Sequence, residues 1–176
     1  MATYVGFLRA INLGANRKFA KADIVAATEA AGFTDVATHI NTGNVRFDTS
    51  LRSRARIEAA LETAYAERAG FEVPTIVFTL AEVCAIVEDG EEVAAGRGGT
   101  HYVSLLKQEP AAATVGQLEA LGDDKDFARV RGRAVHLLMT DPYHQARLTN
   151  AAVEKALGVA TNRNLRVIRA LAEKWC

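Results

Sequence analysis

The stretch TYVGFLRAI, residues 3–11, decides the fold. Read as a β-strand, it places Val5 and Phe7 on one face and Tyr4 and Leu8 on the other, so both faces are apolar. Such a strand is buried on both sides and lies in the centre of a sheet, not at its edge. The rest of the chain must therefore supply flanking strands and helices that cover them.

The segments that follow complete a βαββαβ order. Residues 20–32 have helical periodicity, and two short strands flank Gly43 within residues 36–48, as in a hairpin. Residues 53–70 predict a second helix, and residues 73–79 predict the last strand. This is the order of a ferredoxin-like unit.

The second part of the chain predicts a variant of the same order. Thr79 and Glu82 form a capping box that opens a helix ending near Gly90, and residues 91–99 have the composition of a linker. A strand, a helix and a hairpin turning at Arg131–Gly132 come next, and two helices close the chain, which gives β-α-β-β-α-α.

We therefore expect an α+β protein made of two interlocked ferredoxin-like (βαββαβ-type) halves. The halves are residues 1–79 and 80–176, joined in one compact structural unit, with mixed or antiparallel sheets and helices packed on them.

Composition narrows the class of protein. The chain has 176 residues, 49% of them hydrophobic and 24% charged, with a formal net charge of zero, which argues against unspecific binding of nucleic acid. No apolar run approaches the roughly 18 residues that span a bilayer, and the N-terminus lacks a secretory signal pattern. Cys84 and Cys176 lie far apart and form no disulfide framework, which favours a cytoplasmic protein. We expect no membrane association, no cofactor and no metal site.

Three stretches together resemble one protein family. LRAINLGANRK at 8–18, HINTGNVRFD at 39–48 and VEKALGVATNRN at 153–164 resemble the bacterial family catalogued as domain of unknown function 1697, in order and spacing. Ala10 and Ala15 stand where the family commonly has glycine. The resemblance implies a shared fold and recurrent polar positions, and it implies no reaction.

The same stretches contain all of the candidate binding residues. The loop after the first strand leads into a helix, whose free N–H groups favour an anion, and Arg17 and Lys18 gain little there unless something negative joins them. The alternative is structural: Asn12 and Asn16 bind loop backbone, and the two basic side chains are solvated.

The hairpin and the last helix allow the same two interpretations. Strand pairing would bring Arg46 near Arg9, an arrangement that an anion or Asp48 would stabilise. Thr161 is predicted as the N-cap of the last helix with Asn164 at its third position, an entirely structural account.

We predict that the protein binds an anionic ligand: a nucleotide, a phosphorylated metabolite or an RNA backbone. The alternatives are an enzyme acting on a small phosphorylated or carboxylated substrate, with His39 or an aspartate as the base, and a homo-oligomer without a small ligand. The predicted ligand-binding residues are Arg9, Asn12, Gly14, Asn16, Arg17, Lys18, Asn41, Gly43, Asn44, Arg46, Thr161, Arg163 and Asn164.

Overall fold

The computed structural model describes residues 1–40 and 43–176. The chain divides into two compact units, Met1–Glu82 and Val83–Cys176. Each unit contains a four-stranded antiparallel sheet, so the predicted α+β class is confirmed. That the two halves interlock stays a prediction.

The first unit has the predicted βαββαβ order. Its elements are β1 (Ala2–Leu8), α1 (Lys21–Ala30), β2 (Thr34–Thr38), β3 (Asn44–Thr49), α2 (Arg54–Ala69) and β4 (Thr75–Thr79). The strand order is β2-β3-β1-β4, with every neighbouring pair antiparallel. The apolar strand β1 is therefore central, as its two apolar faces predicted.

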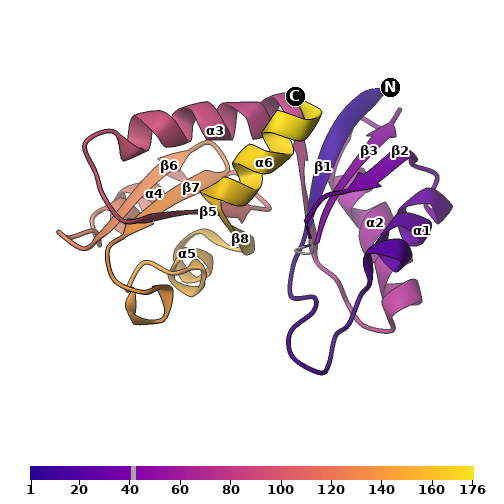
Figure 1. The fold of residues 1–176 in the computed structure, drawn as a ribbon, viewed down its shortest axis with the longest axis horizontal. Helices are drawn as coiled ribbons and strands as arrows, with labels where there is room; N and C mark the ends of the chain where they lie inside the picture. Colours follow the sequence, from indigo (N-terminus) through magenta and orange to yellow (C-terminus); the bar gives the residue numbers. More distant parts are fainter. Residues whose placement is uncertain (41–42) are drawn as a thin grey trace. The chain divides into compact units, whose positions relative to one another are not determined.

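Helices α1 and α2 cover one face of the first sheet (Figure 1). The core beneath them contains Phe47 from β3, Ile24 from α1 and Leu61 from α2, all fully or almost fully buried. The rings of Phe19 and Tyr65 meet edge to face, with centroids 5.4 Å apart. Aromatic pairs of this kind add to the stabilisation that burial provides.

Helix α3 (Leu80–Ala94) begins as predicted and ends later than predicted. The Glu82 carboxylate accepts from the Thr79 N–H at 2.7 Å, and the Thr79 hydroxyl accepts from the Glu82 N–H at 3.2 Å, which is the capping box. The helix continues through Gly90, although a helix end was expected there. A Cβ at Gly90 would lie 3.0 Å from a methyl group of Leu165, so this glycine serves close packing and does not stop the helix.

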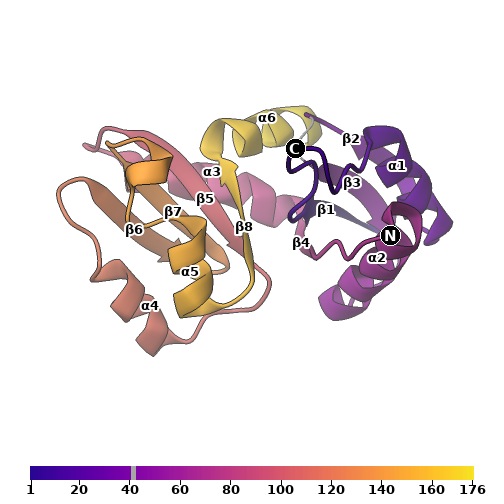
Figure 2. The ribbon, with the colours of Figure 1, turned by 90° about the horizontal axis from the view of Figure 1, so that it is seen from below.

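The second unit repeats the strand order of the first. After α3 it contains β5 (Thr100–Leu106), α4 (Ala112–Glu119), β6 (Asp126–Arg131), β7 (Ala134–Met139), a 3₁₀ turn (Tyr143–Gln145), α5 (Asn150–Leu157), β8 (Ala160–Asn164) and α6 (Leu165–Trp175). The sheet order is β6-β7-β5-β8, all antiparallel (Figure 2). The expected order lacked β8, because residues 161–164 were assigned to the start of the last helix.

The two faces of the second sheet carry different helices. Leu118 of α4 and Val153 of α5 share a core cluster with Leu106 and Leu137 of the sheet. Helices α3 and α6 lie on the opposite face (Figure 1). No helix in the described part of the chain is long and apolar enough to span a membrane.

The two cysteines are joined. Cys84, near the start of α3, and Cys176, directly after α6, form a disulfide with their Cα atoms 6.5 Å apart. The prediction that they form no disulfide is therefore wrong. The reason is that 92 residues of sequence separate two helices that the second unit brings together.

Candidate functional site

The loop between β1 and α1 uses two of its predicted ligand residues internally. The Asn12 Oδ1 accepts from the Phe19 N–H at 3.0 Å, and its Nδ2 donates to the Phe19 carbonyl at 3.3 Å. The Arg17 guanidinium donates to the carbonyls of Ala10 at 2.6 Å and Glu72 at 2.7 Å. Both side chains hold the loop in shape. Asn12 does so as the structural interpretation expected, whereas Arg17, which that interpretation left solvated, binds backbone carbonyls instead.

A hollow lies at the start of α1, and the remaining predicted side chains of the loop do not line it. Asn16 and Lys18 are exposed. The hollow has a volume of about 560 Å³, and Asn12 and Gly43 both line it, so two of the three predicted segments meet there. Most of its lining is apolar, with Lys21 as its one basic side chain among the described residues. It offers an anion little beyond that lysine and a helix N-terminus.

The β2–β3 hairpin packs against the end of β1. The Leu8 N–H donates to the Gly43 carbonyl at 2.8 Å, and Asn44, which is 1% exposed, donates to the His39 carbonyl at 3.3 Å. Gly14 in the first loop and Gly43 in the hairpin both have positive φ, 64° and 73°. These two glycines take the left-handed conformations that glycine adopts without strain.

The two arginines that were expected to meet are not opposite each other. Arg46 of β3 pairs in register with Val5, whereas Arg9 follows the end of β1. Arg46 has its own counter-ion, with its Nη2 2.8 Å from a carboxylate oxygen of Asp35. Asn41 lies outside the described residues.

The third predicted segment lies in the second unit and is a strand. Thr161 and Arg163 belong to β8 and are 5% and 8% exposed; the Arg163 guanidinium donates to the Thr161 hydroxyl at 3.0 Å and to the Asn162 carbonyl at 2.8 Å. Burial lowers the pKa of Arg163 to about 10. The N-cap of α6 is Asn164, whose Oδ1 accepts from the Arg166 N–H at 2.9 Å. The prediction of Thr161 as N-cap is wrong, because this stretch pairs with β5 before the helix starts.

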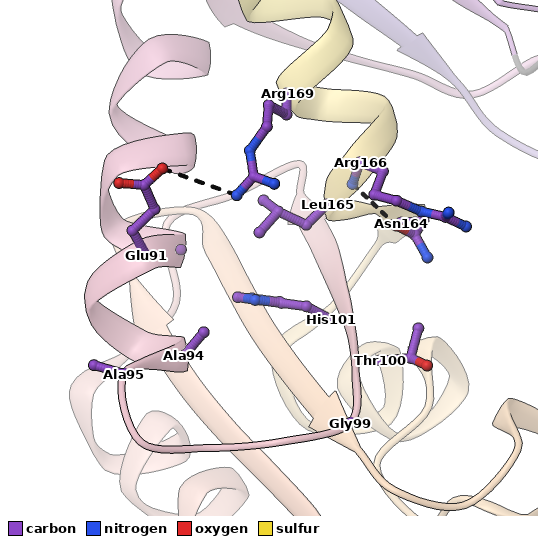
Figure 3. A pocket seen from close by; sticks show the side chains of 11 residues that line it. Glu91, Ala94, Ala95, Gly99, Thr100, His101, Asn164, Leu165, Arg166 and Arg169 are labelled. Carbon is purple, nitrogen blue, oxygen red and sulfur yellow. Dashed lines mark hydrogen bonds and ion pairs between the residues drawn. The ribbon is translucent and has the colours of Figure 1, made fainter.

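A charged pocket of about 660 Å³ opens in the second unit between α3, the start of β5 and the start of α6 (Figure 3). This volume suits a small molecule. Asn164 is the predicted site residue that lines it. The complete lining is Gly90, Glu91, Ala94, Ala95, Gly99, Thr100, His101, Asn164, Leu165, Arg166 and Arg169.

Positive charge exceeds negative charge in this pocket. Arg166 and Arg169 are three residues apart, so they lie on the same side of α6. The Arg169 Nη2 lies 3.9 Å from Glu91 Oε1, and both side chains are well exposed, so this ion pair contributes little to stability. Both arginines line the pocket, but only Arg169 reaches toward Glu91, whereas the Arg166 side chain extends away from that carboxylate (Figure 3). The first turn of α6 adds a partial positive charge.

A histidine pair connects the pocket with the interior of the unit, since His101 lines the pocket and its partner His136 is fully buried. His101 Nε2 and His136 Nδ1 are 3.0 Å apart, and the Figure 3 view shows the His101 ring extending from β5 toward α3. The pKa of His101 is lowered to about 4, mainly by burial and also by the nearby Arg169 cation. The pKa of His136 is lowered to about 3, mainly by burial and also by His101 and Arg131. Both rings are therefore neutral at pH 7, and the arginines supply the charge of the pocket.

Two glycines shape the pocket. Gly90 lets Leu165 approach α3, as described for the fold. Gly99 has a φ of 100°, and a Cβ there would collide with the Met139 carbonyl oxygen, so the turn into β5 requires glycine.

Sequence reasoning missed most of this pocket. Residues 129–176 carry 9 basic and 3 acidic side chains, and Arg166 and Arg169 belong to this basic end. A second signal was the position of His101, two residues before the buried Val103 on the same face of its strand. Among the described residues, no group of three or more His, Cys, Asp or Glu side chains is arranged to hold a metal ion.

Comparison with known proteins gives a family and a fold. The family model described as "Protein of unknown function (DUF1697)" matches residues 1–136. The chain is similar to the conserved bacterial protein SP0830 from Streptococcus pneumoniae, with 18% sequence identity, a TM-score of 0.71, and coverage of 98% of this chain and 97% of that chain. At this identity the likeness shows the fold alone. No curated protein matches the chain.

Proposed function

We propose that this chain, which belongs to the family of proteins of unknown function DUF1697, binds a small anionic ligand in the pocket between α3, β5 and α6. The observation that carries the proposal is that Arg166, Arg169 and the first turn of α6 all border one hollow, in which Glu91 is the one carboxylate among the described lining residues. That the loop after β1 and the β2–β3 hairpin take part in binding stays a prediction.

The donors of the pocket suit a phosphate or carboxylate group. Guanidinium groups bind such groups through charge-assisted hydrogen bonds, often two at a time. The N–H groups at the start of a helix favour the same negative charge. Because Arg169 is only loosely paired with Glu91, an anion can engage it at the loss of a weak surface ion pair.

The size of the pocket favours a small molecule over a polymer. About 660 Å³ lies within the usual range of 300–1,000 Å³ for small-molecule sites. The zero net charge of the chain argues in the same direction, since it provides no extended attraction for a nucleic-acid backbone. The ligand class is therefore a small phosphorylated or carboxylated molecule.

Calorimetric titration with inorganic phosphate, followed by small organic phosphates and carboxylates, tests the proposal. The variants are Arg166→Ala and Arg169→Ala, alone and together, and Arg56→Ala on the exposed side of α2 serves as the control for loss of one positive charge. Losing one charge-assisted bond costs about 1.5–3 kcal/mol, so each pocket variant should weaken binding by roughly 10- to 100-fold.

Two results would contradict the proposal. The first is that no phosphate or carboxylate probe binds the wild-type protein. The second is that Arg56→Ala weakens binding as much as the double pocket variant, which would indicate attraction by overall charge and no defined site.

A further inference from the structure

We propose that the Cys84–Cys176 disulfide is a redox switch on this pocket: the oxidised protein binds the anion, and reduction weakens binding. The inference rests on the proposed function and adds a form of regulation to it. It starts from the fact that the two helices which the disulfide joins are also the two helices that form the charged walls of the pocket.

The spacing along the two helices relates the disulfide to the charged residues. On α3, Glu91 follows Cys84 by seven residues. On α6, Arg169 precedes Cys176, the residue directly after the helix, by seven residues. Seven helical residues are about two turns, or about 10 Å. The disulfide at one end and the Glu91–Arg169 contact at the other therefore span equal lengths of both helices.

The second half of α6 depends on the disulfide more than the first half does. Leu165, Ile168 and Leu171 are buried and hold the first two turns of the helix on the unit. Residues 172–176, all described, include no buried side chain. The covalent bond from Cys176 to α3 therefore tethers a turn without a buried side chain, and this turn directly follows the one that carries Arg169.

The switch needs a dithiol reductant, and its chemistry is a simple exchange. A thiolate of the reductant attacks one sulfur of the disulfide, and the second thiol of the reductant then closes its own disulfide. The S–S bond between Cys84 and Cys176 breaks, the two cysteines gain two electrons and two protons, and the reductant loses the same. Cys176 is exposed, so an attacking thiolate can reach it.

Reduction should change affinity through the position of Arg169. Once Cys176 is free, the last turn of α6 frays, and α3 and α6 lose the covalent link that lies two turns from the Glu91–Arg169 contact. A ligand that uses Arg169 then has to order this part of the helix on binding, which lowers its affinity. Couplings of this kind usually change affinity by about 5- to 150-fold.

The experiment compares phosphate affinity in the oxidised protein and in protein reduced with dithiothreitol, with free thiols counted in each. We expect no free thiol and tighter binding in the oxidised form, and two free thiols with at least about fivefold weaker binding in the reduced form. The double variant Cys84→Ser/Cys176→Ser should bind like the reduced protein and should not respond to dithiothreitol. Amide hydrogen exchange of residues 171–175 should become faster on reduction.

The outcomes separate the two proposals. If oxidised and reduced protein bind phosphate equally well, with binding still lost in the Arg166→Ala/Arg169→Ala variant, the site stands and the switch is overturned. If hydrogen exchange at the end of α6 is unchanged by reduction, or mild oxidation leaves two free thiols, the switch is overturned as well. If the oxidised protein binds neither phosphate nor any of the organic phosphates and carboxylates, both proposals fall.

Discussion

Acid should destabilise this protein through the His101–His136 pair at pH values where carboxylates are still ionised. Burial lowers the pKa of His136 to about 3 in the folded protein, against about 6.5 for a solvated histidine in the unfolded chain. A group whose pKa is lowered by folding contributes its full stability above its unfolded pKa. That stability is lost as the pH falls from 6.5 toward 3, because the unfolded chain takes up the proton first.

The size of the effect follows from the two pKa values. At pH 5 an unfolded histidine is almost fully protonated, whereas His136 in the folded protein is almost fully neutral. The difference in proton uptake lowers the free energy of unfolding by about 2 kcal/mol between pH 7 and pH 5. His101 adds a smaller share, because its ring lines the pocket and is partly screened by solvent.

Guanidinium chloride unfolding at pH 7, 6 and 5 measures this loss. The free energy of unfolding of wild type should fall by about 2 kcal/mol or somewhat more from pH 7 to pH 5. In His136→Leu, where the titrating ring is absent, this fall should be smaller by about 2 kcal/mol. The control is His144→Gln, which removes an exposed histidine and should follow wild type. The reasoning is refuted if wild-type stability is flat from pH 7 to pH 5, or if His136→Leu keeps the wild-type slope.

Three further substitutions test the local geometry, each by denaturant unfolding at pH 7. Gly99→Ala should lower the free energy of unfolding by at least about 2 kcal/mol, because the backbone there has a φ of 100° and the new Cβ would collide with the Met139 carbonyl. An unchanged free energy of unfolding would mean that the turn can rearrange. Ala10→Gly should stabilise the protein by up to about 1 kcal/mol, because Ala10 has a φ of 57° and glycine removes that strain; a loss of stability would contradict this. Thr28→Val should lower the free energy of unfolding by about 1–3 kcal/mol, although valine has the same volume, because the fully buried Tyr65 hydroxyl loses its hydrogen-bond partner at 2.8 Å. Adding Tyr65→Phe to this variant should recover part of that loss.

Local signals in the sequence were sufficient for the first unit. The apolar faces of residues 3–11 predicted a central strand, and β1 lies between β3 and β4. Gly70, in the left-handed conformation, ends α2 where predicted, and the Thr79–Glu82 capping box opens α3. Each of these features depends on side-chain periodicity or on contacts within one turn of the chain, which is the kind of information that a single sequence contains.

The errors arose where distant contacts override a local preference. Gly90 is a common type of helix stop, but Leu165 packs against it, and the helix continues to Ala94. Thr161 is a good N-cap residue, but pairing with β5 makes it part of a strand. Both partners lie more than 50 residues away along the chain, so neither contact could be predicted from neighbouring residues.

The pocket also depends on contacts between residues that are distant in the sequence. Polar residues in neighbouring strands are the sequence signal that points to it. Val103 of β5 has His136 of β7 as its partner on one side and Arg163 of β8 on the other. His101, two residues before Val103, lies on the same face, so antiparallel pairing brings three scattered polar residues to one face of the sheet. His136 is the single polar residue of an apolar strand, whereas His101 and Arg163 have other polar residues in their strands. Burial of such side chains is costly unless they are hydrogen-bonded. When such residues occur in strands that can be neighbours, the sequence predicts a shared polar cluster on that face, and here the cluster lies beneath the helices that form the pocket.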